Sequence, residues 1–388
     1  MTSNLADSHG INSNGESLGT QTSNTQTSST LVSRTTQRSM ALDVFRGITV
    51  ALMLLVNNVA LDDATPAMLL HAPWGGGVRL ADLVFPWFLF ATGLSIPFAY
   101  SSLQRRKPGF ANWVWKVVQR AFWLFALGCL VTSTVAREVV ISLGVLQLIG
   151  LAFLVAALLQ PMPARWRLSS TAVLLVGYWA ALRFLPVPGA AIGTFEESQN
   201  LVRHLNTTYF EPIGLRGLPS VIPTAALVMI ASWVGELTRG SSRSRFKVLG
   251  LIALGATLAA AGLVWDRDLE MNKTVWTPSY ILFTAGIGTG LIGLLTWLET
   301  LRPQTWSFVF VVFGSNALIA YIAPILVKVW LLQSINLRSG VNLQDSWLEW
   351  LKTVTNPVVG GWMYTLIYIA LTWLVLLILY RRKLFLRV

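Results

Sequence analysis

The chain reads LDVFRGITVALMLLVNNVALDDATPAMLLHAPWGGGVRLADLVFPWFLFATG from residue 42 to residue 93. Two apolar runs, each near the length that crosses a bilayer, flank a polar connection in this stretch. An ionisable group at the centre of a membrane helix costs roughly 2.5 to 3.5 kcal/mol, so such groups usually serve a function. Asp43 and Arg46 can equally lie near the interface, where they pair or snorkel. His71, by contrast, favours a functional role. The polar side chains of the stretch that we single out are Asp43, Arg46, Asn57, His71 and Asp82.

The composition indicates an integral membrane protein. Hydrophobic residues make up 54% and charged residues 12% of the chain, whereas soluble domains carry about 25% charged residues. The apolar stretches are continuous and rich in Leu, Ala and Val, without the alternation of a barrel strand. We therefore predict an all-α polytopic bundle of about ten transmembrane helices. The predicted spans are 41–60, 81–100, 112–135, 139–160, 168–185, 217–237, 247–265, 278–298, 305–333 and 358–380.

The charges between these spans predict the orientation of the chain. With both termini cytoplasmic, about 19 Lys and Arg and about 5 Asp and Glu lie inside, against about 10 and about 12 outside, as the positive-inside rule requires. The net charge of +12 then reflects topology and attraction to anionic lipid, and nucleic acid binding is not expected.

The ends of the chain and its reactive side chains add little to this picture. Residues 1–39 are polar and almost free of large apolar side chains, so we expect a disordered tail, followed by one transmembrane domain over 40–388. The single cysteine, Cys129, excludes an internal disulfide, and three histidines leave little material for a metal site. We therefore expect no metal.

Several motifs resemble the heparan-alpha-glucosaminide N-acetyltransferase family and its bacterial-type relatives. They are LDVFRG (42–47), VN (56–57), HAPWGG (71–76), ADLVFPWFLF (81–90), GVLQ (144–147), NKTVWTPSY (272–280) and GSNAL (314–318).

This resemblance implies a transmembrane acyltransferase in a plasma membrane, in particular a bacterial inner membrane. Such an enzyme takes an acetyl group from cytoplasmic acetyl-CoA and delivers it to an amino sugar or other glycan acceptor on the opposite side. The resemblance also implies that His71 and Asn57 lie at the reaction centre. The chain departs from the family at Leu148, where a basic residue is usual, and at 211–214, where an Asp-Pro-Glu-Gly element reads Glu-Pro-Ile-Gly. The acceptor therefore stays open, as does the choice between a monomer and a homodimer.

Acyl transfer assigns a chemical role to each of three side chains. A neutral imidazole at His71 can remove the proton of the attacking amine or hydroxyl, or can itself carry the acetyl group. The amide of Asn57 can donate to the thioester oxygen as negative charge develops there. Asp82 can hold the tautomer of the imidazole or cap the helix that follows it, and its position before an apolar run favours the cap.

Coenzyme phosphates require positive charge on the cytoplasmic side. We predict that Arg46, Lys116 and Arg120 supply it, since Lys116 and Arg120 are four residues apart and share a helix face. Each of these side chains can instead be an ordinary positive-inside charge. Arg105, Arg106 and Lys107 extend the same basic region.

Two other classes of protein compete with an enzyme. A transporter of a small polar or anionic solute also places charges within the membrane, and prolines inside the spans could mark broken helices. A scaffolding membrane protein would explain the hydrophobicity but not the combination of Asn57, His71 and Asp82. No internal repeat relates the two halves of the chain, which weakens the transporter hypothesis.

Overall fold

A computed structural model of the chain confirms the all-α class. Apart from one two-stranded hairpin, the regular elements of the described residues are helices. Residues 39–388 form one unit, and the predicted tail, 1–39, lies outside the described residues. The structure describes residues 40–106, 109–239, 245–301, 305–338 and 340–386.

Each of the ten predicted apolar stretches contains a helix, although the stretch 139–160 is helical only over Val145–Leu159. The corresponding elements are α1 (Met40–Asn58), α2 (Leu80–Gln104), α3 (Phe110–Ala136), α4 (Val145–Leu159), α5 (Ala164–Phe184), α7 (Val221–Thr238), α8 (Arg245–Trp265), α9 (Pro278–Leu301), α10 (Ser307–Ser315) with α11 (Ala317–Val327), and α13 (Pro357–Arg381). Shorter elements in the connections are α6 (Leu201–Leu205), β1 (Asn336–Arg338), β2 (Val341–Asn342) and α12 (Leu343–Val354).

Not all of these helices are long and apolar enough to cross a membrane. Within the described residues seven meet that criterion, and the bent pair of α10 with the helix after it, which extends to Leu332, makes eight. Helix α4 has only 15 residues, and α5 carries three arginines along its length. The protein is therefore a multi-pass membrane protein by composition and helix length, and the number ten stays a prediction.

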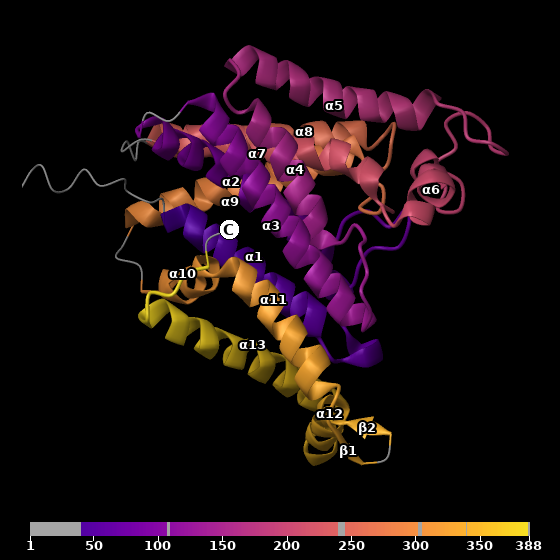
Figure 1. Ribbon diagram of the computed structural model, residues 1–388, viewed down its shortest axis with the longest axis vertical. Coiled ribbons are helices and arrows are strands. Elements are labelled where there is room, and N and C mark those ends of the chain that lie inside the picture. The colour runs from indigo at the N-terminus through magenta and orange to yellow at the C-terminus, as the bar shows by residue number, and fades with distance from the viewer. Residues whose placement is uncertain (1–39, 107–108, 240–244, 302–304, 339, 387–388) are drawn as a thin grey trace, which may run out of the picture. The chain divides into compact units, whose positions relative to one another are not determined.

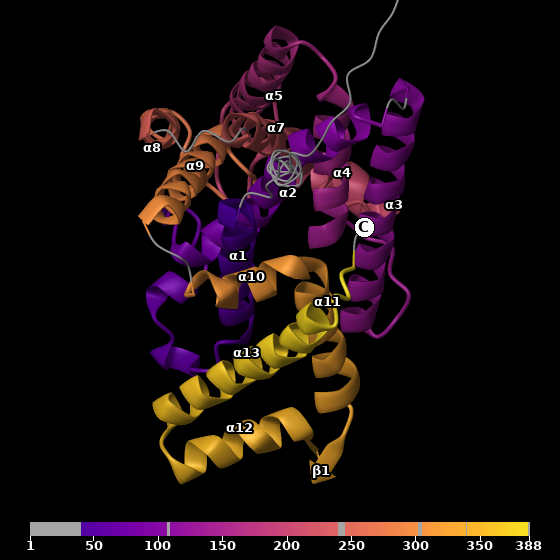
Figure 2. The same ribbon diagram turned by 90° about the vertical axis from the view of Figure 1, so that its left-hand side faces the viewer.

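Helices α2 and α7 form the centre of the bundle. They pack against each other, and α4 and α9 contact both. Helix α7 buries nearly three quarters of its apolar window, whereas α8 and α13 bury less than a quarter of theirs, as expected for helices that face lipid. Figures 1 and 2 both show α10, α11 and α13 on the side of α1 that is remote from α5.

Small residues bring α8 and α9 into close contact. A side-chain carbon at Gly255 would collide with the backbone of Gly286 and Gly290, and one at Gly286 would collide with the backbone of Ala259. Close backbone approach through small residues is the usual way in which membrane helices associate, because lipid supplies no hydrophobic driving force between them.

A buried ion pair attaches the polar helix α5 to α7. The two terminal guanidinium nitrogens of Arg167 donate to the carboxylate of Glu236, at 2.8 and 2.9 Å, and Gln160 donates to the same carboxylate at 2.7 Å. The Arg167 guanidinium also lies over the ring of Trp233, 4.6 Å from its centroid. A bidentate, hydrogen-bonded arrangement of this kind satisfies charges that would otherwise be costly to bury.

The break in a membrane-length helix falls at an asparagine and not at a proline. Helix α2 continues through Pro86 and Pro97, whereas α10 and α11 meet at Asn316 with a bend of 74°. The buried amide of Asn316 donates to the carbonyl of Leu384 and accepts from the N–H of Leu386. The segment after α13 therefore satisfies the polar group at the break.

Two connections on one side of the bundle meet beside the start of α2. The first follows α1 and turns at Gly75 and Gly77, whose φ values are +72° and +73°. The second, residues 266–277, precedes α9, and Tyr280 at the start of α9 donates through its buried hydroxyl to the carbonyl of Asp82. This contact between α2 and α9 holds the two connections together.

Candidate active site

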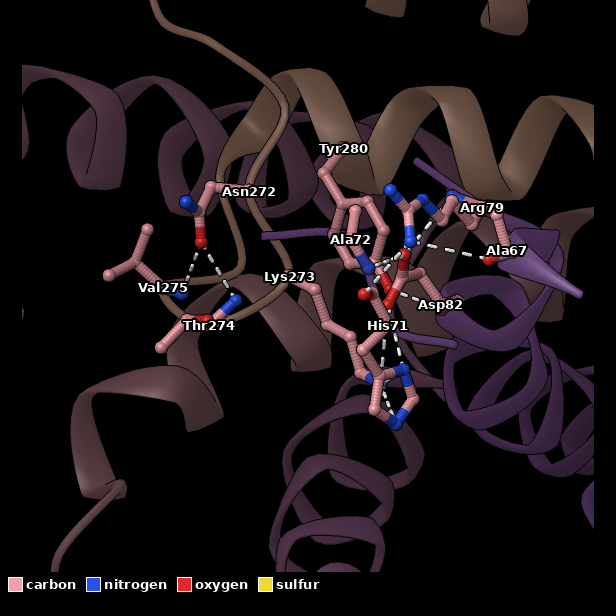
Figure 3. Close-up of polar contacts among 10 residues, drawn as sticks. All are labelled: Ala67, His71, Ala72, Arg79, Asp82, Asn272, Lys273, Thr274, Val275 and Tyr280. Atoms are coloured by element: carbon pink, nitrogen blue, oxygen red, sulfur yellow. Dashed lines mark hydrogen bonds and ion pairs between the residues drawn. The ribbon is translucent and has the colours of Figure 1, made fainter. Parts of the chain in front are cut away.

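The histidine and the carboxylate that the sequence indicated lie in contact. His71 Nδ1 is 2.9 Å from Asp82 Oδ1, and the side chains are 57% and 3% exposed, respectively. The other carboxylate oxygen of Asp82 accepts the backbone N–H groups of Ala72, at 3.1 Å, and Arg79, at 3.0 Å. Asp82 therefore makes both of the contacts that we considered, since its carboxylate accepts the N–H of Arg79 at the start of α2 and also meets the imidazole (Figure 3). Its part in catalysis stays a prediction.

A third side chain joins this pair from a distant part of the chain. Lys273 Nζ lies 2.9 Å from His71 Nδ1, 3.3 Å from His71 Nε2 and 3.6 Å from Asp82 Oδ1. The two ring nitrogens point in different directions, so a group this close to both lies over the ring (Figure 3). Burial lowers the pKa of Lys273, and the neighbouring Asp82 charge partly opposes that shift.

The turn that carries Lys273 is fixed by its own side chains. The Asn272 side-chain oxygen accepts the N–H of Thr274 at 2.8 Å and of Val275 at 3.3 Å. Thr277 accepts the N–H of Asn272 through its hydroxyl. Trp276 adopts a φ of +55° and packs its ring edge-on against Phe85 of α2, with centroids 5.1 Å apart. The position of Lys273 is therefore determined by a rigid turn and not by its side chain alone.

These residues surround a cavity of about 300 Å³. This volume lies at the lower end of the range for small-molecule sites. Within the described part of the chain, no group of three His, Cys, Asp or Glu side chains is arranged to hold a metal. The cavity is lined by His71, Ala72, Pro73, Trp74, Gly77, Asp82, Phe85, Met271, Asn272, Lys273, Thr274 and Trp276.

Asn57 does not line this cavity. It lies in the last turn of α1, where its side chain is exposed. Its neighbour Asn58 donates to the carbonyl of Leu54 and accepts from Thr365 of α13, which ties this end of α1 to a different part of the bundle. The structure thus brings His71 and Asp82 together and leaves Asn57 outside the cavity, so its role stays a prediction.

The predicted coenzyme residues fall only partly together. Lys116 and Arg120 line a second cavity, of about 290 Å³, between α2, α3 and α4. The Arg120 guanidinium lies over the Phe153 ring, 4.6 Å from its centroid. Arg46 is outside the lining and pairs with Asp43 at 3.8 Å. The second cavity is lined by Ala99, Ser102, Leu103, Arg106, Trp113, Lys116, Val117, Arg120 and Phe153.

Sequence reasoning missed Lys273 as a site residue. Its motif, residues 272–280, carries the family resemblance, and one further signal in the sequence indicates a special role for the lysine. Lysine is depleted on the outer side of membrane proteins, and Lys273 falls in a predicted outer connection directly before a span. A basic residue in that position requires an explanation, which the contact with Asp82 and His71 now supplies.

Fold and site together define a multi-pass membrane protein with a histidine–carboxylate pair at the end of its bundle. A sequence model of the family described as heparan-alpha-glucosaminide N-acetyltransferase, catalytic, matches residues 38–262. Since this match covers more than half of the chain, the protein belongs to that family. The matched region includes His71, Asp82, Lys116 and Arg120, and ends before Lys273.

Two curated relatives are similar to the chain over most of its length. The mouse (Mus musculus) heparan-alpha-glucosaminide N-acetyltransferase is 23% identical over 356 residues, which cover 74% of this chain and 53% of the relative. The human (Homo sapiens) protein of the same name is 24% identical over 359 residues, covering 75% of this chain and 53% of the relative. The chain thus spans about half the length of the curated relatives that it matches.

Proposed function

We propose that this protein is a membrane acetyltransferase that moves an acetyl group from acetyl-CoA to an amine or hydroxyl on the opposite side of the membrane. The observation that carries the proposal is the contact between His71 and the buried Asp82 in a cavity at one end of the bundle. Membership of an N-acetyltransferase family supports the same chemistry.

The contact with Asp82 selects the form of the imidazole that can act as a base. A carboxylate only accepts hydrogen bonds, so Nδ1 carries the ring proton when His71 is neutral. Nε2 then carries the ring lone pair, with Lys273 Nζ 3.3 Å away. Since more than half of the His71 side chain is exposed, this lone pair is accessible to an acceptor that enters the cavity. A base held in this way contributes roughly 10²- to 10⁴-fold to a proton transfer.

The reaction follows from this assignment. The acceptor nitrogen or oxygen attacks the thioester carbonyl carbon while His71 Nε2 takes its proton. The tetrahedral intermediate then expels the thiolate of coenzyme A as the carbon–sulfur bond breaks, and the proton on His71 passes to the thiolate or to solvent. In the competing route, Nε2 attacks the carbonyl carbon first, and the acceptor displaces the imidazole in a second step.

The second cavity is the proposed site of the coenzyme phosphates. Three of its lining side chains, Arg106, Lys116 and Arg120, are cationic, and guanidinium groups suit phosphate oxygens. Arg46 belongs to the proposed site only as a more distant positive charge.

The two cavities open along one side of α2. Phe85 of the first cavity and Ala99 of the second are 14 residues apart, about 21 Å along the helix, and face within about 40° of each other. Leu89 and Ile96 are fully buried between them. For the thioester arm to reach His71, α2 and its neighbours must therefore separate along this face.

The proposed setting follows the predicted topology. The basic cavity lies at the cytoplasmic end, the His71 cavity at the opposite end, and the membrane is a bacterial inner membrane. The proposed acceptor class is an amino sugar or glycan, because the matched relatives carry heparan-alpha-glucosaminide in their names.

A vesicle assay tests the proposal. Purified protein in liposomes receives labelled acetyl-CoA on the side of the basic cavity, and a panel of amino sugars and glycans is enclosed on the other side. We expect label to appear in an enclosed acceptor with the wild type and not with His71→Ala. Equal labelling by both proteins would refute the proposed base, and no labelling by the wild type across the panel would refute the enzyme.

A further inference from the structure

The cavity around His71 contains one lysine or arginine among its described lining residues, and that residue is Lys273. Its ammonium is 3.3 Å from Nε2, the atom that takes the proton in the proposed reaction. Any carbonyl group under attack beside Nε2 must therefore lie close to this cation. The side chain is 26% exposed, so water screens its charge only in part.

We infer that Lys273 is a catalytic residue whose ammonium donates to the thioester oxygen and stabilises the oxyanion of the tetrahedral intermediate. This inference rests on the proposed acetyl transfer. As the acceptor attacks, the carbonyl π electrons move to the oxygen, which then accepts a hydrogen bond from Nζ. When the intermediate collapses, these electrons reform the carbonyl bond and the thiolate of coenzyme A departs. Lys273 keeps its proton throughout.

The side-chain amides near the reaction are less suited to stabilising the oxyanion than this ammonium is. Asn57, which the family resemblance favours, is exposed at the end of α1 and outside the cavity. The oxygen of Asn272 already holds the turn through Thr274 and Val275. A charged donor also forms a stronger hydrogen bond to an oxyanion than a neutral amide does.

The geometry of the cluster keeps the ammonium in place before the substrate arrives. Asp82 balances its charge at 3.6 Å, and the turn that carries it is fixed on both sides. A donor that is already oriented requires no reorganisation when negative charge develops. Asp82 thus serves both partners, since it orients His71 and neutralises Lys273.

The charge of Lys273 predicts the alkaline side of the pH profile. Burial lowers its pKa from the ordinary 10.5, and Asp82 opposes the shift. The rate should therefore fall as the ammonium deprotonates, at a pH below that of a free lysine. The titratable and charged groups around this cluster are His71 and Arg79 on the first connection, Asp82 in the first turn of α2, and Tyr280 of α9, whose hydroxyl donates to the carbonyl of Asp82. Glu270 of the second connection lies beside Gly75.

Three variants test the assignment in full-length protein. Lys273→Met should reduce the turnover rate by roughly 10²- to 10³-fold, as does the loss of one oxyanion donor elsewhere. Lys273→Cys in a Cys129→Ala background, treated with 2-bromoethylamine, rebuilds an ammonium at the same site and should regain most of the lost rate. Lys352→Met is the matched control, because this lysine pairs with Asp62 away from the cavity and should leave the rate unchanged.

The pH profile separates a catalytic role from a structural one. The sulfur in the rebuilt side chain withdraws electrons from the amine, so its alkaline limb should move to lower pH than in the wild type. A merely structural lysine would leave the limb in place. Thermal unfolding of each variant, with and without coenzyme A, reports whether the fold and the donor site are intact.

The outcomes distinguish this inference from the proposed function. If His71→Ala is inactive while Lys273→Met transfers acetyl at the wild-type rate, the proposed role of Lys273 is wrong. The assignment of His71 as the base then still stands. Failure of the rebuilt ammonium to restore activity in folded protein would likewise overturn the inference, as would an unmoved alkaline limb. A wild type that acetylates nothing would overturn both.

Discussion

Replacement of Asp82 by asparagine tests whether the carboxylate controls the tautomer of His71. The new amide side chain would have one oxygen for two sets of partners. The backbone N–H groups of Ala72 and Arg79 require an acceptor, so the oxygen must face them and the NH₂ group must face His71. Nδ1 then has to accept a hydrogen bond, which places the ring proton on Nε2. The base is lost although the side chain keeps its shape.

The expected magnitudes follow from the bonds that survive. The helix cap is retained, so stability should fall by only about 1 kcal/mol, mainly through the lost charge opposite Lys273. Acetyl transfer should fall by roughly 10²- to 10⁴-fold, the value of a correctly oriented base. Asp82→Ala should be equally inactive and less stable, because a lost cap costs about 0.5 to 2 kcal/mol more.

Steady-state acetyl transfer and thermal unfolding measure these two effects separately. Asp345→Asn is the matched control, since Asp345 also occupies the first turn of a helix, α12, where its carboxylate accepts from the side-chain amide of Asn342, away from the cavity. We expect that control to transfer acetyl at the wild-type rate. If folded Asp82→Asn protein does so too, the argument that Asp82 fixes the imidazole is refuted.

Four further predictions address the base, the amide of Asn57, the donor site and the topology. His71→Ala should lose roughly 10²- to 10⁴-fold in turnover, and Asn57→Ala should lose roughly 10²- to 10³-fold only if its amide reaches the oxyanion. An unchanged Asn57→Ala rate would remove that residue from the site. Coenzyme A at about 100 times its Kd should stabilise the wild type by about 2.7 kcal/mol, and Arg120→Met should lose most of this stabilisation in a thermal unfolding assay. A full shift in the variant would place the phosphates elsewhere. Alkaline phosphatase fused after residue 108 should be inactive, and export of an active fusion would contradict the cytoplasmic assignment of that connection.

Much of the fold could be predicted because a membrane helix is a local property of its sequence. Each of the ten apolar stretches contains a helix, since a backbone in hydrocarbon must satisfy its hydrogen bonds within the segment. Hydropathy did not determine which helices contact one another or which side chains pair between them. Helix α5 carries three arginines, and the partner of Arg167 is Glu236 on α7, 69 residues away.

The candidate site likewise combines a contact between residues close in the sequence with a contact between residues far apart in it. His71 and Asp82 are 11 residues apart, on the first connection and in the first turn of α2, so their contact depends on the turns at Gly75 and Gly77 and on the cap of α2. Lys273 is 202 residues from His71 and reaches it only because α9 packs on α2 through Tyr280 and Asp82.

Sequence alone thus determined the class of protein and most of its helical segments, and it named His71 and Asp82 as candidates while favouring the cap for Asp82; their contact comes from the structure. The tertiary structure decided which cation joins that pair, that Asn57 stands outside the cavity, and that Lys116 and Arg120 share a cavity which Arg46 does not line. The physical reason is that hydropathy and capping act over one helical turn or one span. Contacts between connections depend instead on how whole helices pack, and interhelical packing leaves no periodic signal at the residues that it brings together.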